Sequence, residues 1–215
     1  ALGPKINQLN TDLIKFACNY KPDLIFIYRG RHIKSRTISK IKQALNGTLI
    51  FSYNNDDPFS KNYPSYYWRH YLSCVKLCDH VFCYRPKNIT DLHALHIFNC
   101  SILRSYFITA NNFETNTDFN SRQHDVVFAG HFEDDGRDET IKHLLDNRIN
   151  ISLFGTGWNE SKYANFFDKT LGSIRRLNPE EYNKLLNDSK ISLVFLSKRN
   201  NDQYTRRCFE IPATG

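Results

Sequence analysis

The sequence predicts an α/β protein with two domains, each built around a mainly parallel sheet. Short apolar, β-branched or aromatic runs alternate with longer amphipathic segments, and this alternation is typical of strand–helix–strand units. Most of the runs are continuously apolar, as expected for strands that are covered on both faces. A polar segment without periodicity, residues 111–123, separates two such series and marks a domain boundary.

The short runs are the predicted strands. Their β-branched and aromatic residues fit a pleated, buried surface. They comprise residues 24–28, 48–52, 80–84, 102–107, 126–129, 151–154 and 191–196.

Three segments between these runs carry clear helix signals. Apolar residues recur at helical spacing over residues 6–17 and again over residues 38–45, where Asn46 and Gly47 end the pattern. A third helix is predicted to begin after Asn178, a good capping residue, with Pro179 at its first position and acidic residues in its first turn.

The two domains are predicted as residues 1–115 and 124–215, joined by a linker over residues 116–123. Each is short for a complete doubly wound domain, so we expect the first to be truncated at its start and the second at its end.

Composition and charge limit the class of protein. The 215 residues are 40% hydrophobic and 24% charged, and no apolar run approaches the roughly 18 residues that span a bilayer. Six sparse cysteines and no secretory signal at the visible start favour a reducing compartment, so a cytoplasmic location is expected. The net charge of +7 favours an anionic partner, but the basic residues are scattered, which argues against nucleic acid. The charge is also compatible with peripheral contact of the protein with the inner face of an anionic membrane.

In open parallel sheets, ligands bind beyond the carboxyl ends of the strands. The residues that follow the predicted strands therefore form the candidate site. These loops are 29–32, 54–59, 130–137, 155–158 and 197–199, and they are rich in charge, glycine and aromatic residues.

The last segment, Phe209–Gly215, resembles the Phe-Glu-Ile-Pro-Ala-x-Gly signature of the CgeB-like (spore-maturation) glycosyltransferases. Residues 125–130 with Arg137 are similar to the start of that family's donor domain. The segments 154–158, 178–185 and 56–59 are similar to its other motifs, in the same order. The resemblance implies two Rossmann-like domains of the GT-B type, an acceptor-side one before a donor-binding one. It also implies transfer of a hexose from a nucleotide-sugar donor to a glycan, lipid-linked or protein acceptor, as in polysaccharide biosynthesis.

The resemblance and the chemistry of such a donor together select the donor-binding residues. Arginines and the amides of glycine turns suit a diphosphate, and a carboxylate accepts hydrogen bonds from both ribose hydroxyls. The predicted donor contacts are Gly130, Arg137, Gly155, Gly157, Trp158, Arg207 and Glu210. Trp158 is equally compatible with the core, and Glu210 with a merely favourable charge at a helix end.

Three residues are predicted to be catalytic. His131 follows a strand and a glycine turn, where a general base could stand, or it is a surface histidine. Asp202 lies eight positions before Glu210, the spacing of the paired acids in retaining transferases of this architecture. Asp57 belongs to the predicted acceptor side, although Asp before Pro is also typical of a turn.

No metal site and no cofactor are predicted besides the nucleotide sugar as co-substrate, because arginines and helix dipoles can stabilise a leaving diphosphate. Cys74, Cys78, His80 and Cys83 match no common zinc spacing and are interpreted as buried residues with free thiols. The aromatic stretch 63–71 is interpreted as a helix face in the core. A non-catalytic nucleotide- or glycan-binding module on the same fold is the alternative function.

Overall fold

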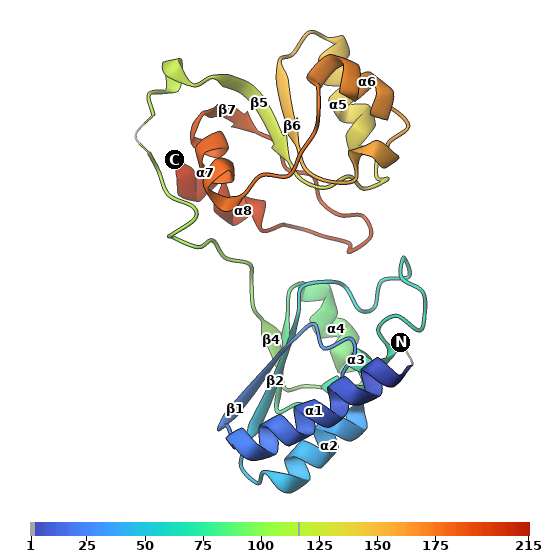
Figure 1. The fold of residues 1–215 in the computed structure, drawn as a ribbon. Helices are drawn as coiled ribbons and strands as arrows, with labels where there is room; N and C mark the ends of the chain where they lie inside the picture. The colour runs from blue at the N-terminus through green and yellow to red at the C-terminus, as the bar shows by residue number, and fades with distance from the viewer. Residues whose placement is uncertain (1–2, 116) are drawn as a thin grey trace. The chain divides into compact units, whose positions relative to one another are not determined.

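The computed structural model describes residues 3–115 and 117–215 (Figure 1). Residues 1, 2 and 116 lie outside the described residues, so the first positions of the predicted N-terminal domain and of the predicted linker lie there too. The chain divides into two compact units. Unit 1 contains the described residues up to Arg104 together with Arg199–Asn201, and unit 2 contains Ser105–Lys198 and Asp202–Gly215.

Unit 1 is built on a four-stranded parallel sheet in the order β1-β2-β3-β4. Because right-handed crossovers that always step in the same direction place their helices on one face, this order predicts a sheet covered on one side. Its elements are α1 (Pro4–Tyr20), β1 (Leu24–Tyr28), α2 (Ser35–Ala44), β2 (Leu49–Asn54), α3 (Arg69–Val75), β3 (His80–Cys83), α4 (Pro86–Ala94) and β4 (Cys100–Ile102).

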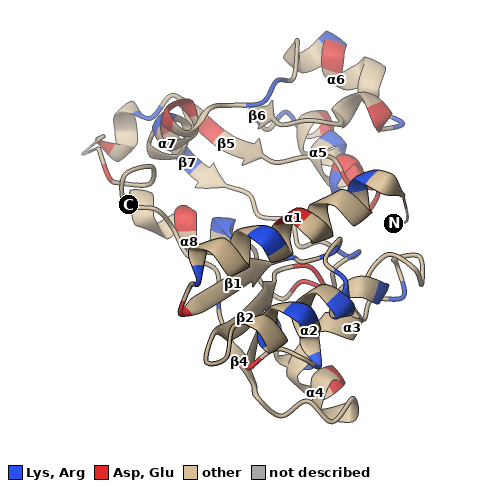
Figure 2. Ribbon diagram, turned by 60° about the horizontal axis from the view of Figure 1, so that its bottom comes forward, with Lys and Arg blue, Asp and Glu red and all other residues tan. Residues whose placement is uncertain are grey.

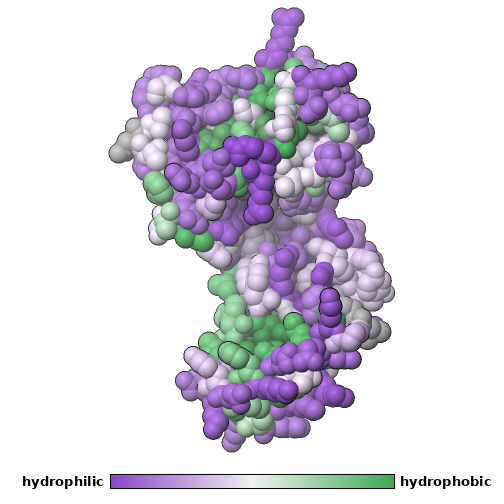
Figure 3. All heavy atoms as spheres, viewed as in Figure 1, coloured by the Kyte–Doolittle hydropathy of each residue, from purple (hydrophilic) through white to green (hydrophobic). Residues whose placement is uncertain are grey.

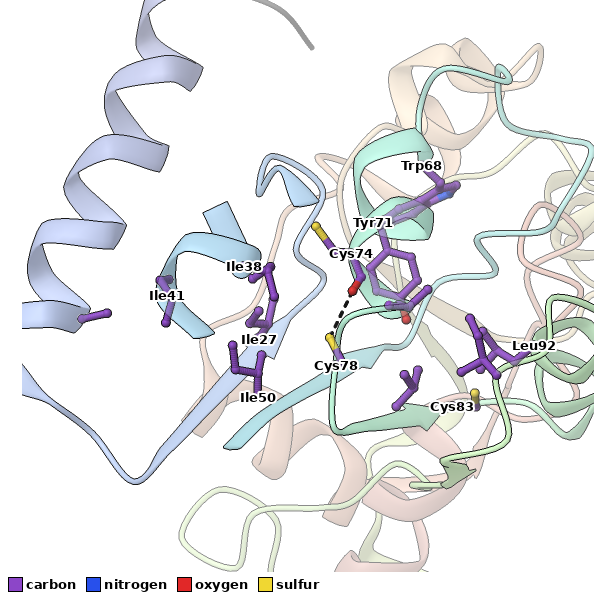
Figure 4. Packing of buried hydrophobic residues seen from close by; sticks show 14 residues of the cluster. Ile27, Ile38, Ile41, Ile50, Trp68, Tyr71, Cys74, Cys78, Cys83 and Leu92 are labelled. Carbon is purple, nitrogen blue, oxygen red and sulfur yellow. Dashed lines mark hydrogen bonds between the residues drawn. The ribbon is translucent and has the colours of Figure 1, made fainter. Parts of the chain in front are cut away.

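The core of unit 1 lies between that covered face and the helices (Figure 4). Ile27, Ile50 and Val81 of neighbouring strands point into it, and α2 contributes Ile38 and Ile41. The remaining buried members come from α1, α3, α4 and the loops beside them. All four helices of the unit thus share one core on one side of the sheet.

The opposite face of this sheet carries large apolar side chains that are exposed. Phe26 and Tyr28 on β1 are 49% and 55% exposed, and Leu49 on β2 is 48% exposed. The ring of Phe26 contacts those of Tyr53 and Phe82 on the adjacent strands. A hydrophobic area is visible on unit 1 in Figure 3. The expectation that the strands are covered on both faces is therefore wrong for unit 1, because apolar runs alone do not reveal the direction of the crossovers.

The cysteines near α3 are buried free thiols. Cys78 Sγ donates to the carbonyl oxygen of Cys74 at 3.5 Å (Figure 4), and Cys83 lies at the end of β3. Burial raises the pKa of Cys74 to about 11 and that of Cys78 to about 12. The aromatic stretch before them is not the predicted helix: α3 begins only at Arg69, and the preceding rings pack in turns, with Trp68 buried in the core.

Asp79, directly before β3, forms hydrogen bonds with both α2 and β2 of unit 1. Its carboxylate accepts from Lys42 Nζ of α2 at 2.7 Å and from the main-chain N–H of Ile50 on β2 at 2.8 Å. Burial opposes ionisation, but these donors hold the pKa of Asp79 below its usual value.

A depressed carboxyl pKa gives stability that is present above the unfolded-state pKa and lost as the pH falls through the folded-state pKa. We expect the free energy of unfolding to fall as the pH drops below about 4, and to fall less in Asp79→Asn. Urea denaturation across that range measures it. The exposed Asp23→Asn serves as control and should follow the wild type; an equal fall in all three proteins would contradict the role of Asp79.

Unit 2 is built on a three-stranded parallel sheet in the order β6-β5-β7. The chain steps from β5 to β6 and then returns past β5 to β7, so the direction of the crossovers reverses at β5. Its elements are η1 (Phe119–Ser121), β5 (His124–Ala129), α5 (Arg137–Asp146), β6 (Ile151–Phe154), η2 (Trp158–Glu160), α6 (Ala164–Leu171), α7 (Pro179–Asn187), β7 (Ser189–Ser192), α8 (Arg207–Glu210) and η3 (Pro212–Thr214).

Both faces of this second sheet are covered. Phe128 on β5 packs in a core with Ile141 of α5 and Phe167 of α6. The helix α7 packs against β5 and β7, where Leu185 and Leu186 are buried. The predicted start of α7 is confirmed, with Asn178 and Glu181 forming a reciprocal capping box around Pro179.

Two of the observed strands differ in position from the strands predicted from the sequence. The run 102–107 forms a strand only as far as Ile102, because β4 pairs with β3 over Cys100–Ile102 alone. The last strand is Ser189–Ser192 rather than 191–196, because its partner β5 aligns His124 with Ser189. Within the described residues, no helix has the length and apolar character that a membrane crossing requires.

Candidate functional site

Unit 2 contains a cavity of about 430 Å³ at the carboxyl ends of β5 and β6, next to the strand where the crossovers reverse. In open parallel sheets this is the usual position of a bound ligand. The cavity is lined by Ala129, Gly130, His131, Phe154, Gly155, Thr156, Arg176, Leu177, Tyr182, Arg206, Arg207 and Glu210.

Two glycines let the backbones of the two strand ends approach each other. Gly155 has a φ of 141°, and a Cβ built on it would overlap the carbonyl oxygen of Gly130. The main-chain N–H of Gly130 donates to Phe154 O at 2.8 Å, and Gly130 O accepts from Trp158 Nε1 at 2.9 Å. A side chain at Gly155 would therefore push apart groups that are already hydrogen-bonded.

Gly130 makes room for a cation. A Cβ on this residue would lie 2.5 Å from Nη2 of Arg207 and 2.6 Å from the ring of Phe128. The Arg207 guanidinium lies over that ring, 5.4 Å from its centroid, and its Nε donates to Ala129 O at 2.6 Å. Burial lowers the pKa of Arg207 from its usual high value. With one edge held by the backbone, its other nitrogens are oriented at the glycine turn.

Glu210 is the acid of the cavity, and two side chains hold its carboxylate. The Tyr182 hydroxyl of α7 donates to Oε2 at 3.2 Å, and Arg206 Nε lies 2.6 Å from Oε1. Burial, followed by the Glu210 carboxylate, raises the pKa of Tyr182. The acid is thus fixed at one side of the cavity, with Arg207 three residues earlier in the same short helix.

The charges of this cavity favour an anion. Arg176, Arg206 and Arg207 line it, against one carboxylate, Glu210. Elsewhere, charges of both signs are spread over the ribbons of both units (Figure 2). Guanidinium groups beside a glycine turn are suited to phosphate oxygens, which accept forked and main-chain donors.

The structure brings five of the predicted site residues together: Gly130, His131, Gly155, Arg207 and Glu210 all line this cavity. Gly157 and Trp158 line an adjoining cavity of about 520 Å³, which shares Gly155, Thr156 and Arg176 with the first. Arg137, Asp202 and Asp57 line neither of the two.

Arg137 and Trp158 are both 3% exposed and support the site from within unit 2. The Arg137 guanidinium forms a two-pronged pair with Asp135, at 2.8 and 2.6 Å, and donates to His131 O at 2.6 Å. It therefore fixes the loop that carries His131. The indole of Trp158 packs against Phe128 and Phe167 in the core.

His131 lies at the rim of the cavity, with its side chain 60% exposed. Its Nε2 is 2.8 Å from Oε1 of Glu133, and Oε2 of the same carboxylate accepts from Ser197 Oγ at 2.7 Å. Burial opposes ionisation of Glu133, but these contacts hold its pKa below the usual value. The imidazole thus has a carboxylate that orients it, as a general base requires.

Asp57 belongs to unit 1 and is fully buried. Its Oδ1 accepts from Phe59 N at 3.0 Å and Asn88 Nδ2 at 2.8 Å, and its Oδ2 accepts from Asn201 Nδ2 at 2.9 Å. With both oxygens bound to protein donors, the carboxylate is arranged to hold a loop rather than to take a proton from an acceptor.

Asp57→Asn is expected to cost about 2 kcal/mol of unfolding free energy, because an amide would present hydrogens to groups that already donate. Urea denaturation measures this, with Asp23→Asn as the exposed control in the same unit. The sequence prediction of a catalytic Asp57 makes the opposite claim, namely lost turnover at unchanged stability, and that result would contradict the structural role.

The sequence analysis missed three residues of this cavity, namely Arg176, Tyr182 and Arg206. Tyr182 lies on α7, and its hydroxyl reaches Glu210. An aromatic residue with a polar tip on a half-buried helix face is the signal that could have found it. Within the described residues, no group of three or more His, Cys, Asp or Glu side chains could hold a metal ion.

Residues 137–215 match the model of a family described as glycosyl transferase-like. No curated protein matches the sequence. Similar solved structures include that of Staphylococcus aureus MnaA with UDP, at 12% identity and a TM-score of 0.58, covering 89% of this chain and 59% of that one. Another is a UDP-N-acetylglucosamine 2-epimerase candidate from Listeria monocytogenes, at 10% identity and a TM-score of 0.57, covering 87% and 55%.

At these identities the likeness establishes the fold. The predicted α/β class, with two Rossmann-like units and parallel sheets of the GT-B type, is confirmed. The chain spans less than two thirds of the length of either structure.

Proposed function

We propose that this chain is part of a glycosyltransferase that binds a nucleotide-sugar donor in the cavity of unit 2. The observation that carries the proposal is that Arg207 and Glu210 line the same cavity, beside Gly130 and Gly155. A diphosphate needs cationic and main-chain donors, and a ribose diol needs a fixed acceptor, and one cavity offers both. The glycosyl transferase-like domain over residues 137–215 supports the same reading.

In the proposed complex the diphosphate lies at the Gly130 turn against Arg207, and the ribose hydroxyls donate to Glu210. Tyr182 and Arg206 keep the Glu210 carboxylate in place. The closing motif at Phe209–Gly215 supports membership of the CgeB-like transferases and transfer of a hexose, as in polysaccharide biosynthesis. The acceptor is a glycan, a lipid-linked molecule or a protein.

For the transfer step we propose electrostatic stabilisation of the leaving diphosphate by Arg207, assisted by Arg206 and Arg176, without a metal. His131, oriented by Glu133, is the proposed general base, and Asp202 is proposed to act near the donor sugar. We place the reaction in the cytoplasm, which is supported by the free cysteines.

UDP is the first nucleotide to test, because the similar structure of MnaA contains it. We expect UDP to raise the melting temperature of the whole chain more than GDP or CMP. Glu210→Gln keeps the shape of the side chain but weakens its hydrogen bonds to ribose, so affinity should fall about fivefold. Glu160→Gln, an exposed change outside the cavity, should leave the shift unchanged.

Failure of all three nucleotides to shift the melting temperature would contradict the donor site. The alternative of a non-catalytic binding module is separated by turnover. Release of UDP from UDP-sugars, with and without added acceptors, supports a transferase, whereas tight binding without any release supports the module.

A further inference from the structure

Unit 1 contains a larger cavity of about 920 Å³, at the carboxyl end of β1 and beside α1. All the residues that line it belong to unit 1, so it is separate from the donor cavity. Neither the glycosyl transferase-like domain nor the proposed donor contacts include any of them.

The walls of this cavity are largely apolar. α1 contributes Leu9, Leu13 and Phe16, and the opposite side contributes Ile33 and the ring of Tyr67. Leu9 and Phe16 are 47% and 67% exposed, although α1 packs its other face into the core. Aliphatic side chains offer no hydrogen bonds to a sugar or to the edge of a base. These walls therefore suit a hydrocarbon chain.

The polar end of the cavity contains charges of both signs: Arg29 pairs with Asp56 there, and Asp12 on α1 is a second carboxylate of the lining. The Arg31 guanidinium stacks on Tyr67, 4.3 Å from the ring centroid, and its Nη2 is 3.4 Å from His32 Nε2. Within the part of the chain that the structure describes, no carboxylate forms an ion pair with Arg31, whereas Arg29 pairs with Asp56. Burial, and then the charge of Arg31, lower the pKa of His32. Of the two arginines in the lining, Arg31 is thus the one that can meet an anion.

Two ring atoms next to this end lack partners among the described residues: Nδ1 of His32 and Nε1 of Trp68 are buried without hydrogen bonds. Both residues line the cavity. The cavity thus combines an apolar channel, a stacked and unpaired guanidinium, and polar atoms that remain unsatisfied, which is the arrangement expected for an amphipathic anion.

We propose that unit 1 binds a single-chain lipid phosphate, with its hydrocarbon along Leu9, Leu13 and Phe16 and its phosphate on Arg31. A phosphate offers more acceptor oxygens than a carboxylate to the Arg31 guanidinium, which is not engaged in an ion pair like that of Arg29 with Asp56. Binding of this lipid stands by itself, and only its role as the acceptor rests on the proposed function.

The test is a calorimetric titration of the whole chain with farnesyl phosphate below its micelle concentration. We expect saturable one-to-one binding. Farnesol, which lacks the phosphate, inorganic phosphate, which lacks the chain, and palmitate, a lipid carboxylate, should each bind at least roughly tenfold more weakly. No saturable binding of farnesyl phosphate, or equal binding of farnesol or palmitate, would overturn the proposal.

Variants locate the site. Arg31→Gln should weaken farnesyl phosphate binding about tenfold, and Phe16→Ser, at an exposed position, should also weaken it. Arg36→Gln removes the same charge at an exposed position outside the cavity and should have no effect. Unchanged binding in Arg31→Gln would overturn the assignment.

Vesicle binding distinguishes a site for a single lipid molecule from a surface that contacts a membrane. Binding to phosphatidylcholine vesicles that is equal in wild type and Arg31→Gln, without binding of farnesyl phosphate, would assign the apolar wall to a membrane and overturn the proposal. Because no nucleotide is present in either arm, the lipid site and the donor site can fail independently.

Discussion

Arg207→Gln is expected to weaken UDP binding about 100-fold, because it removes a desolvated, charge-assisted contact to the diphosphate worth nearly 3 kcal/mol. The guanidinium is half-buried, and the Ala129 carbonyl and the Phe128 ring hold one side of it. A cation fixed in this way needs little ordering when it meets a phosphate. Calorimetric titration of UDP into each protein measures the loss.

Two further variants make that result specific. Arg207→Lys keeps the charge but cannot bond Ala129 O and a phosphate with one planar group, so it should fall between wild type and Arg207→Gln. Arg148→Gln removes an exposed charge that lines neither cavity of unit 2, and it should bind UDP like the wild type. Equal affinity of Arg207→Gln and Arg148→Gln would remove Arg207 from the donor site.

Gly155→Ala should be the most destabilising single-methyl change in unit 2, costing about 3 kcal/mol of unfolding free energy. Its φ of 141° is unfavourable for any L side chain, and the new Cβ would overlap Gly130 O. That carbonyl cannot retreat easily, since it accepts from Trp158 Nε1 and its own residue donates to Phe154 O. Chemical denaturation followed by circular dichroism gives the number.

Gly172→Ala separates steric overlap from backbone strain in this comparison. Gly172 also has a positive φ, 74°, but a Cβ there meets nothing within 4 Å. Strain alone should cost about 1 kcal/mol. If both variants lose the same stability, the close approach of the two strand ends at Gly130 and Gly155 is not what requires the glycine.

The fold was largely predictable because local signals and topology agree. The capping box at Asn178 and the apolar faces of α1 and α2 are local properties that a sequence displays directly. The ends of β4 and β7 were not predictable, since strand length depends on which partner residues are available for pairing. The exposed face of the first sheet follows from the direction of the crossovers, which no single run of residues encodes.

The candidate site was predictable where a residue's role comes from its position after a strand. Gly130, His131 and Gly155 follow β5 and β6 and do meet at one cavity. Arg137 and Trp158 occupy the same kinds of position, but their long side chains turn inward to Asp135 and to Gly130 O. A glycine turn in the sequence indicates where a ligand could approach the backbone. The direction of a long side chain depends instead on neighbours that are distant in the sequence.

The central claim is that the cavity bounded by Gly130, Gly155 and Glu210 binds a nucleotide diphosphate. A crystal structure of the chain with saturating UDP tests it most directly. We expect phosphate density within hydrogen-bonding distance of Arg207, and the ribose hydroxyls within hydrogen-bonding distance of the Glu210 carboxylate. UDP bound in the cavity of unit 1 beside Arg31, or the donor cavity without nucleotide at saturation, would contradict it.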